Sequence, residues 1–283
     1  MPRNGLLIAL AAPGTAFLLL FFFLPLSALP VEALSSGANG VRRLLEDSVF
    51  WKGLRGTLIL GTAAPLFSVV VGFCLSLFLA RLGPLPRRCL LILVSLPLTF
   101  SGLVIAYGFI LVFGRSGFLT LLLSELGADP ATVGAFIYSP VGLGFAYSYY
   151  LIPRAILVLL PVIVNFDRSQ LLAAASLGAS EFRAHLDIMV PQIMPAGLSA
   201  FCLTAAVAIG AYGTALALVG TQVNILPLLL YSKISETGSD LPTAAALSIV
   251  LMAITSAVMV LAEVFGSIGR SHSSDAGNGV MNG

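Results

Sequence analysis

The sequence contains very little charge. Asp, Glu, Lys and Arg make up 9% of its 283 residues, whereas 58% are hydrophobic, and the mean hydropathy is +1.04. Ordinary soluble domains carry roughly a quarter charged residues. The composition therefore excludes a soluble globular domain and predicts an integral protein of the lipid bilayer. The net charge of +2 is too small to indicate a nucleic-acid partner.

Residues that carry out chemistry are also scarce. The three cysteines are scattered without a CxxC pair, which favours apolar packing over redox chemistry. His185 and His272 stand alone, so no metal site and no catalytic cluster is expected, and a membrane-embedded enzyme is disfavoured. A phosphate-binding loop needs Lys followed by Ser or Thr, but Lys52 and Lys233 precede Gly and Ile. The chain is therefore not expected to hydrolyse ATP itself.

Uncharged runs predict the fold. A helix needs about 20 apolar residues to cross a bilayer, and six such runs occupy residues 6–29, 56–80, 89–114, 140–164, 194–220 and 243–261. We expect an all-α, polytopic protein with six transmembrane helices, and a retained first span rather than a cleaved signal peptide. The transmembrane domain is assigned to residues 1–265, and residues 266–283 to a polar, disordered tail. Residues 118–126 are expected to form a short interfacial helix, and residues 130–139 and 221–242 to form outer loops, with 226–231 along the membrane surface.

Basic residues indicate the orientation. Arg81, Arg87 and Arg88 lie in the short linker between the second and third runs, which the positive-inside rule places in the cytoplasm. The loop after the first run is also basic, and it lies on the opposite side. On balance both termini are predicted to be cytoplasmic.

A polar island at residues 167–195 interrupts the apolar pattern between the fourth and fifth runs. Asp167 can cap a short helix, with Gln170 in the position of a capping-box partner. Gly178 is the residue expected just past a helix end, and Ser180 can cap a second helix. The sequence thus predicts two short helices, hinged at Gly178, that protrude at a membrane face.

Residues 172–191 resemble the EAA loop of type I ABC importer permeases, the membrane subunits of binding-protein-dependent uptake systems. In that loop Glu-Ala-Ala is followed after three residues by Gly, and thirteen residues later by Pro. The positions that match here are Ala173, Ala174, Gly178, Val190 and Pro191, with Ala179, Ser180, Phe182 and Ile188 as common choices in the loop. Leu172 stands where the family has its acid. An ordinary amphipathic cytoplasmic loop is the alternative interpretation.

The resemblance implies partners and a mechanism. In the family this loop is a cytoplasmic coupling helix that docks on an ABC ATPase dimer, so ATP and Mg would be bound by that partner and no cofactor by this chain. A second permease subunit would complete the path, and Leu172 favours a heterodimer over a homodimer. A periplasmic solute-binding protein would deliver a small polar solute across the bacterial inner membrane by alternating access. The alternative, an ion-gradient-driven secondary transporter, is disfavoured because no acid lies at mid-membrane.

Aromatic side chains within the spans are candidates for the solute path. Tyr107, Tyr147, Tyr149 and Tyr212 could line a cavity or simply fill helix interfaces. Arg154 is the one basic residue well inside a span, and snorkelling to the cytoplasmic surface or structural pairing is favoured for it. The sequence most resembles the polyamine, phosphonate, ferric-iron and sulfate branch of the family, without separating these solutes.

Overall fold

A computed structural model describes residues 3–35, 39–220, 222–235 and 240–279, with side chains described from residue 11 to residue 265. The described residues form helices and no strand, which confirms the all-α fold class. The elements are α1 (Arg3–Leu18), the π-helical turn η1 (Leu19–Phe23), α2 (Leu24–Leu34), α3 (Asn39–Glu46), α4 (Ser48–Arg81), α5 (Pro84–Ser95), the 3₁₀ turn η2 (Leu96–Thr99), α6 (Gly102–Phe113), α7 (Phe118–Glu125), α8 (Pro130–Ala135), the 3₁₀ turn η3 (Phe136–Tyr138), α9 (Pro140–Val164), α10 (Ser169–Ser176), α11 (Glu181–Ala184), the π-helical turn η4 (His185–Met189), α12 (Val190–Ile209), α13 (Gly213–Val219), α14 (Leu226–Ser235) and α15 (Leu241–Gly279).

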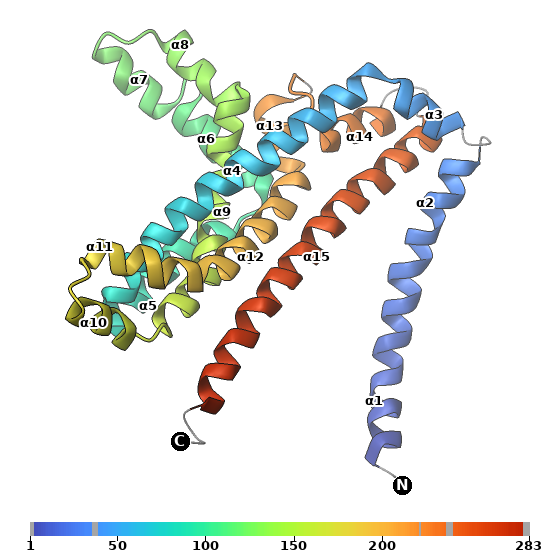
Figure 1. Cartoon of the computed structure of the whole chain (residues 1–283). Coiled ribbons are helices and arrows are strands. Elements are labelled where there is room, and N and C mark those ends of the chain that lie inside the picture. Colours follow the sequence, from blue (N-terminus) through green and yellow to red (C-terminus); the bar gives the residue numbers. More distant parts are fainter. Residues whose placement is uncertain (1–2, 36–38, 221, 236–239, 280–283) are drawn as a thin grey trace.

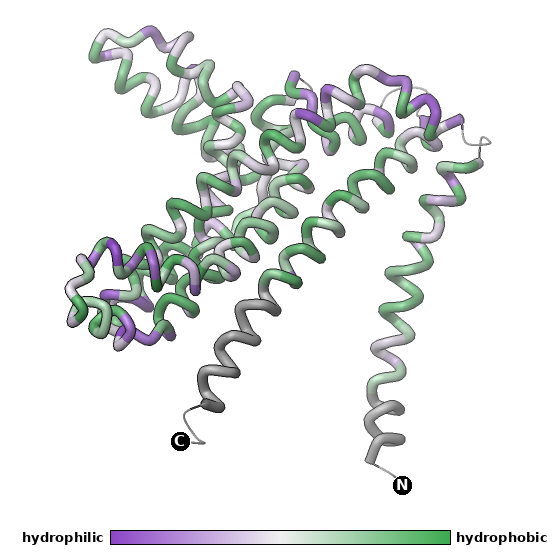
Figure 2. The backbone as a smooth tube through the Cα atoms, viewed as in Figure 1, coloured by the Kyte–Doolittle hydropathy of each residue, from purple (hydrophilic) through white to green (hydrophobic). Residues whose placement is uncertain are grey.

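Six helical stretches of the described chain are long and apolar enough to cross a membrane, as the sequence predicts. They are Ala11–Leu34, Ser48–Arg81, Gly102–Glu125, Pro140–Val164, Glu181–Ile209 and Leu241–Phe265. Figure 2 shows apolar residues along most of their length and polar residues gathered at the helix ends and connections. The chain is thus a multi-pass membrane protein.

The ends of the long helices define two ends of the molecule. Helices α10 and α11 lie at the same end as the starting point of α1 and the final turns of α15 (Figure 1). We call this the hairpin end. Helices α3, α7, α8 and α14 lie at the opposite end, which we call the far end. The first and last described residues therefore lie on the side of the polar island, as an even number of crossings requires.

Helix α9 lies at the centre of the fold and packs against α4, α6, α12 and α13. Small residues allow the helices to approach closely. A Cβ added at Gly72 of α4 would stand 2.8 Å from the Cβ of Ala155, and one at Gly61 would stand 2.6 Å from Ile209 Cγ1. Because both contacts hold α4 against α9 and α12, these three helices form a tightly packed unit.

Two of the predicted spans are interrupted. The expected third span, residues 89–114, is broken by η2, where Pro97 lacks an N–H group, and Ser101 then caps α6 by accepting a hydrogen bond from Val104 N at 3.4 Å. The expected fifth span, residues 194–220, ends early because α12 stops at Ile209. Its remainder forms α13 after a break at residues 210–212.

Segments that the sequence assigns to loops are partly helical. The helix expected at residues 118–126 forms as α7, whose interfacial position stays a prediction, whereas the predicted loop 130–139 forms α8 and η3. Residues 226–231 belong to α14, in which Leu226 and Leu228 are buried against the core, and their position along the membrane surface stays a prediction. Helix α15 continues to Gly279, through much of the predicted tail, and residues 280–283 lie outside the described residues. The division into residues 1–265 and a disordered tail stays a prediction.

Ion pairs hold the far end together and neutralise some of the basic residues there. Arg43 Nη2 lies 3.2 Å from Asp240 Oδ1, and Lys233 Nζ lies 3.2 Å from Asp47 Oδ2. These contacts tie α3 and the connection before α4 to α14 and to the start of α15. The positive charge of the loop after the first span, which opposes the orientation predicted by the positive-inside rule, is therefore partly neutralised.

Candidate functional site

The turn between α10 and α11 has the geometry that the sequence predicts. Gly178 adopts a φ of +86°, a conformation that glycine accepts readily. Its N–H donates to Ala175 O at 3.0 Å, and Ala179 N donates to Ala174 O at 3.0 Å, which together form a Schellman motif. The carbonyls at the end of α10 are thereby satisfied, so the turn between the two helices is well defined.

The second helix of the hairpin is capped as expected, and the first is not. Ser180 Oγ accepts a hydrogen bond from Arg183 N at 3.4 Å. Asp167 precedes the N-cap residue Arg168 and accepts hydrogen bonds from Ser169 N at 2.9 Å and from Ser169 Oγ at 2.8 Å. These bonds, from the backbone N–H first and then the hydroxyl, lower the pKa of the Asp167 carboxyl below its usual value.

The predicted capping box at Gln170 is wrong. Gln170 Oε1 instead accepts a hydrogen bond from Gln192 Nε2 at 2.6 Å, across 22 residues of sequence. Because Gln192 belongs to the first turn of α12, this bond ties α10 to α12. No local pattern in the sequence indicates this pair, since both residues are common on helix surfaces.

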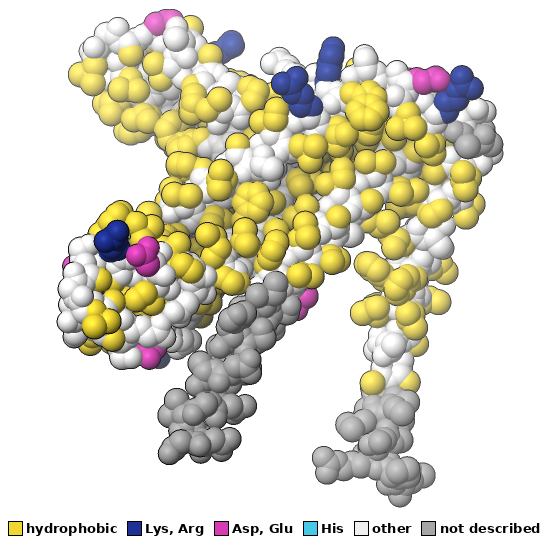
Figure 3. All heavy atoms as spheres, viewed as in Figure 1, with side chains coloured by type: hydrophobic (Ala, Val, Ile, Leu, Met, Phe, Trp, Pro, Cys, Tyr) yellow, Lys and Arg dark blue, Asp and Glu magenta, His cyan; other side chains and the backbone are white. Residues whose placement is uncertain are grey.

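Large apolar side chains project from the hairpin. The exposed fractions are 70% for Leu172, 89% for Leu177 and 76% for Phe182. Ala173, Ser180 and Pro191 are also exposed, whereas Ala174 and Ala179 are half-buried. Figure 3 shows hydrophobic atoms beside charged ones on this lobe. Exposed apolar groups clustered at a polar end of a membrane protein are typical of a protein-binding surface. Leu177 is not among the residues predicted from the sequence, although a leucine directly before the turn glycine could have indicated it.

The hairpin is anchored to the end of α4. Arg168 Nη2 donates a hydrogen bond to Ala80 O at 3.3 Å. Between the hairpin and the ends of α4 and α9 lies a pocket of about 520 Å³, lined by residues that include Leu77, Phe166 and Leu171. A pocket thus separates part of the hairpin from α4 and α9, and the hairpin contacts the spans through a few defined hydrogen bonds.

The candidate tyrosines of the solute path are dispersed. Tyr147 is fully buried and donates a hydrogen bond to Ala211 O at 2.8 Å, which holds α9 to the break after α12. Tyr149 and Tyr107 expose 44% and 56% of their surfaces, and the ring of Tyr149 packs 5.5 Å from that of Phe109. Tyr212 is half-buried beside Tyr231. Tyr147 is therefore part of the core of this chain, while the others stay candidates.

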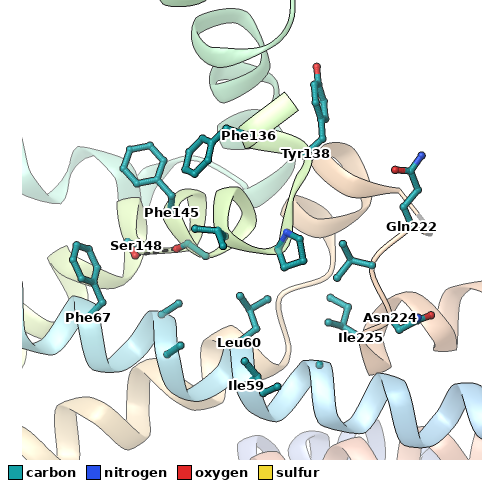
Figure 4. A pocket seen from close by; sticks show the side chains of 17 residues that line it. Ile59, Leu60, Phe67, Phe136, Tyr138, Phe145, Ser148, Gln222, Asn224 and Ile225 are labelled. Atoms are coloured by element: carbon teal, nitrogen blue, oxygen red, sulfur yellow. Dashed lines mark hydrogen bonds between the residues drawn. The ribbon is translucent and has the colours of Figure 1, made fainter. Parts of the chain in front are cut away.

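A second pocket, larger than the one beneath the hairpin, lies elsewhere and has a volume of about 870 Å³. It lies between α4 and α9 near the far end and is closed by residues 222–225. Figure 4 shows Leu60 of α4 and Phe145 of α9 facing it, while the polar ends of Tyr138 and Gln222 point away. Its apolar walls and its lack of converging polar groups suit helix packing better than a polar solute. None of the four candidate tyrosines lines it. Among the described residues no group of His, Cys, Asp and Glu could hold a metal ion.

Comparison of the sequence with known proteins identifies a matching family and several relatives. Residues 72–267 match the family described as binding-protein-dependent transport system inner membrane component. A Salmonella typhi permease protein named for a 2-aminoethylphosphonate transport system is 30% identical over 243 residues, which cover 82% of this chain and 80% of that protein. The sulfate transport system permease protein CysT of Synechocystis sp. is 24% identical over 267 residues, which cover 92% of this chain and 89% of that protein.

A solved structure has the same fold. The crystal structure of a bacterial alginate ABC transporter, in complex with a periplasmic protein bound to an alginate pentasaccharide, contains a chain that aligns with a TM-score of 0.76. The two chains share 19% sequence identity, and the alignment covers 92% of this chain and 93% of the other. The chain belongs to the family of binding-protein-dependent transport system inner membrane components, and it is a permease subunit of an ABC importer.

Proposed function

We propose that this permease takes mechanical work from a separate ABC ATPase dimer through the α10–α11 hairpin. The observation that carries this proposal is the exposure of Leu172, Leu177 and Phe182 on a well-defined turn. At Leu172, where the family motif has an acid, the exposed contact is apolar, so docking here relies on burial of apolar surface rather than on a charged contact. ATP and Mg are bound by the ATPase, and this chain needs no cofactor.

The hairpin transmits motion because it is bonded to two spans. Arg168 holds α4 and Gln170 holds α12, so a displacement of the hairpin moves both helices. Closure of the ATPase dimer would bring the hairpins of two permeases together and open the path on the opposite side. Hydrolysis would reverse the motion, which is a rigid-body transition between two packed states.

The second permease is proposed to be a different chain. The relatives include two sulfate permease proteins of Synechocystis sp., CysT and CysW, the latter 25% identical over 258 residues. A different partner can keep the acidic contact that Leu172 lacks. Purification of the tagged complex followed by intact mass measurement distinguishes one permease species from two.

The hairpin end is proposed to be cytoplasmic, in the bacterial inner membrane, with both termini on that side. Arg81, Arg168 and Arg183 lie at this end, and within the described side chains they form no ion pair, whereas at the far end Arg42, Arg43 and Lys233 pair with acids. A periplasmic binding protein would then deliver the solute to the far end.

The cargo is proposed to be a small oxyanion. The relatives are named for sulfate and for 2-aminoethylphosphonate, and in the described spans acids lie near the ends, as do Glu32, Glu181 and Glu263. A polycation would need acids or an aromatic cage along its way. Uptake of labelled sulfate and 2-aminoethylphosphonate into proteoliposomes that contain the whole complex, with spermidine as the comparison, tests this assignment.

A matched pair of variants tests docking. Leu126 is 81% exposed, precedes Gly127, which has a φ of +92°, and ends α7 in the same Schellman geometry, with Ala128 N donating to Leu123 O at 3.1 Å. It lies at the far end, so Leu126→Asp is the control for Leu177→Asp. Co-purification of the ATPase with the tagged permease should fall at least about tenfold in Leu177→Asp and remain in Leu126→Asp. Equal recovery of the ATPase with both variants would refute docking at the hairpin.

A further inference from the structure

Arg154 is a cation within the central span. It stands fourteen residues after Pro140 and ten before Val164, which are the ends of α9. At 1.5 Å per residue its Cα lies about 21 Å and about 15 Å from those ends. In a bilayer core about 30 Å thick it therefore lies far from both surfaces.

The side chain does not extend toward the nearer surface. Its Cζ atom lies over the ring of Tyr150, 5.6 Å from the ring centroid. Tyr150 precedes it by one helical turn, so the guanidinium leans toward the start of α9, away from the hairpin end. Helical side chains are tilted toward the N-terminus of their helix, which favours this direction. Snorkelling to the hairpin end, which the sequence analysis favours for Arg154, is therefore not what the structure has.

Structural pairing is not observed either. Within the described part of the chain Arg154 makes no ion pair, because the pairs found there join other residues at the far end. No hydrogen bond of its guanidinium to a described residue is found, so its five N–H donors are free for a ligand. The face of Tyr150 holds the cation by a cation–π contact without using these donors.

The surroundings of Arg154 are incompletely covered. Tyr150 beneath it is 6% exposed, but Leu157, less than one turn further along α9, is 47% exposed. A charge on a surface that faced lipid at this depth would be strongly unfavourable. Since α9 is also the central helix of the fold, its open face is better suited to a water-filled path between two permeases.

We infer that Arg154, supported by the ring of Tyr150, is a binding point for oxyanions at mid-membrane on the solute path of this permease. This inference deepens the oxyanion transport proposed above and rests on it for the cargo class. A guanidinium presents paired N–H donors that match the oxygen spacing of sulfate, phosphonate and carboxylate groups. A single contact of this kind selects anions and still allows release, because it does not enclose the ligand.

A cysteine at position 157 tests the inference without knowledge of the cargo. In the whole complex, with Cys74, Cys89 and Cys202 replaced by Ala, Leu157→Cys is treated with anionic sulfonatoethyl and cationic trimethylammonioethyl methanethiosulfonate. We expect both reagents to react and the anionic one to be favoured, with the ratio of rates falling at least about tenfold when Arg154→Gln is added. Arg55→Gln, which removes an exposed charge near the far end, should leave the ratio unchanged.

Transport gives the second readout. Arg154→Gln should lower oxyanion uptake at least about tenfold while the complex still assembles and the binding protein still stimulates ATP hydrolysis. Arg154→Lys should retain part of the uptake, and Arg55→Gln nearly all of it. If wild-type vesicles take up no oxyanion, the cargo proposal fails, yet an anion preference at position 157 that depends on Arg154 would still uphold the site.

Three results would overturn the inference. The first is a thiol at position 157 that neither reagent reaches in any nucleotide state, since Arg154 would then not face water. The second is a reagent ratio that Arg154→Gln leaves unchanged. The third is disassembly of the complex in Arg154→Gln with full recovery in Arg154→Lys, which would identify Arg154 as the partner of an acid on the second permease.

Discussion

Arg168 extends from the hairpin to the end of α4, where its Nη2 donates a hydrogen bond to the carbonyl oxygen of Ala80 across 3.3 Å. This carbonyl belongs to the last turn of α4, where carbonyls lack helical partners and the helix dipole favours a cation. The bond therefore satisfies a backbone group and links the hairpin to a long span. It joins the hairpin, which is proposed to dock on the ATPase, directly to α4.

Loss of this link should weaken coupling. In Arg168→Ala, solute uptake per ATP hydrolysed should fall about two- to fivefold, because an exposed charged contact contributes at most about 1 kcal/mol. Uptake per ATP hydrolysed in Arg168→Lys should lie between the values of the wild type and of Arg168→Ala. Arg183→Ala is the control, since Arg183 is exposed on the same hairpin and its side chain makes no such bond in the described chain. Uptake and hydrolysis are measured together in proteoliposomes, and an unchanged ratio in Arg168→Ala would exclude a role for the bond.

Substitution of the turn glycine should uncouple the transporter. A β-branched residue at a φ of +86° is strained, so Gly178→Val should lower the free energy of unfolding by about 1–2 kcal/mol and displace α11. Gly127→Val introduces the same strain at a φ of +92° in the same motif at the far end. Uptake per ATP should be lost in Gly178→Val and kept in Gly127→Val. Normal uptake by the Gly178→Val complex would contradict the prediction that the turn at Gly178 is a hinge required for coupling.

The bond between Gln170 and Gln192 should contribute to the position of the hairpin. A double-mutant cycle with Gln170→Ala and Gln192→Ala, followed by thermal unfolding of the purified complex, should give an interaction free energy of about 0.5–1 kcal/mol. Strict additivity of the two substitutions would show that the 2.6 Å contact does not stabilise the assembled protein.

Acid should weaken the far end. Burial raises the pKa of Asp240, but hydrogen bonds from Thr243 and the charges of Arg43 and Lys233 lower it by more, so that it lies below the usual 3.8. The carboxylate therefore stabilises the fold fully above pH of about 4, and this stabilisation is lost as the pH falls through the lowered pKa. Thermal unfolding at pH 7, 4.5 and 3 should show that the wild type loses stability between pH 4.5 and pH 3. The substitution Asp240→Asn should make this loss of stability smaller. Identical pH profiles would rule out this contribution.

Local chemistry explains which features of the hairpin the sequence predicts. The positive φ of Gly178 and the cap at Ser180 depend on residues within one turn, so a short pattern suffices to find them. The Gln170–Gln192 and Arg168–Ala80 contacts join residues 22 and 88 positions apart. Such contacts depend on how the helices pack, and no periodicity in one chain encodes them directly.

The interrupted spans show a second limit. An uncharged run predicts where the chain can enter the bilayer, because composition sets the cost of burial. It does not predict continuity of the helix, which Pro97 and Ser101 interrupt in the third run. The direction of Arg154 was likewise inaccessible from hydropathy, since it depends on the aromatic ring one turn away.

The most direct measurement of the central proposal places a photoreactive label at the hairpin. Leu177→Cys, in a chain whose three native cysteines are replaced by Ala, is labelled with a benzophenone maleimide in the assembled complex, with Leu126→Cys as the comparison. The label at position 177 should form a cross-link to the ATPase subunit, with a yield that changes on addition of ATP, and the label at position 126 should not. If the label at position 177 captures no ATPase, or if a membrane-impermeant thiol reagent reaches the thiol at position 177 from outside intact cells, the proposed coupling is wrong.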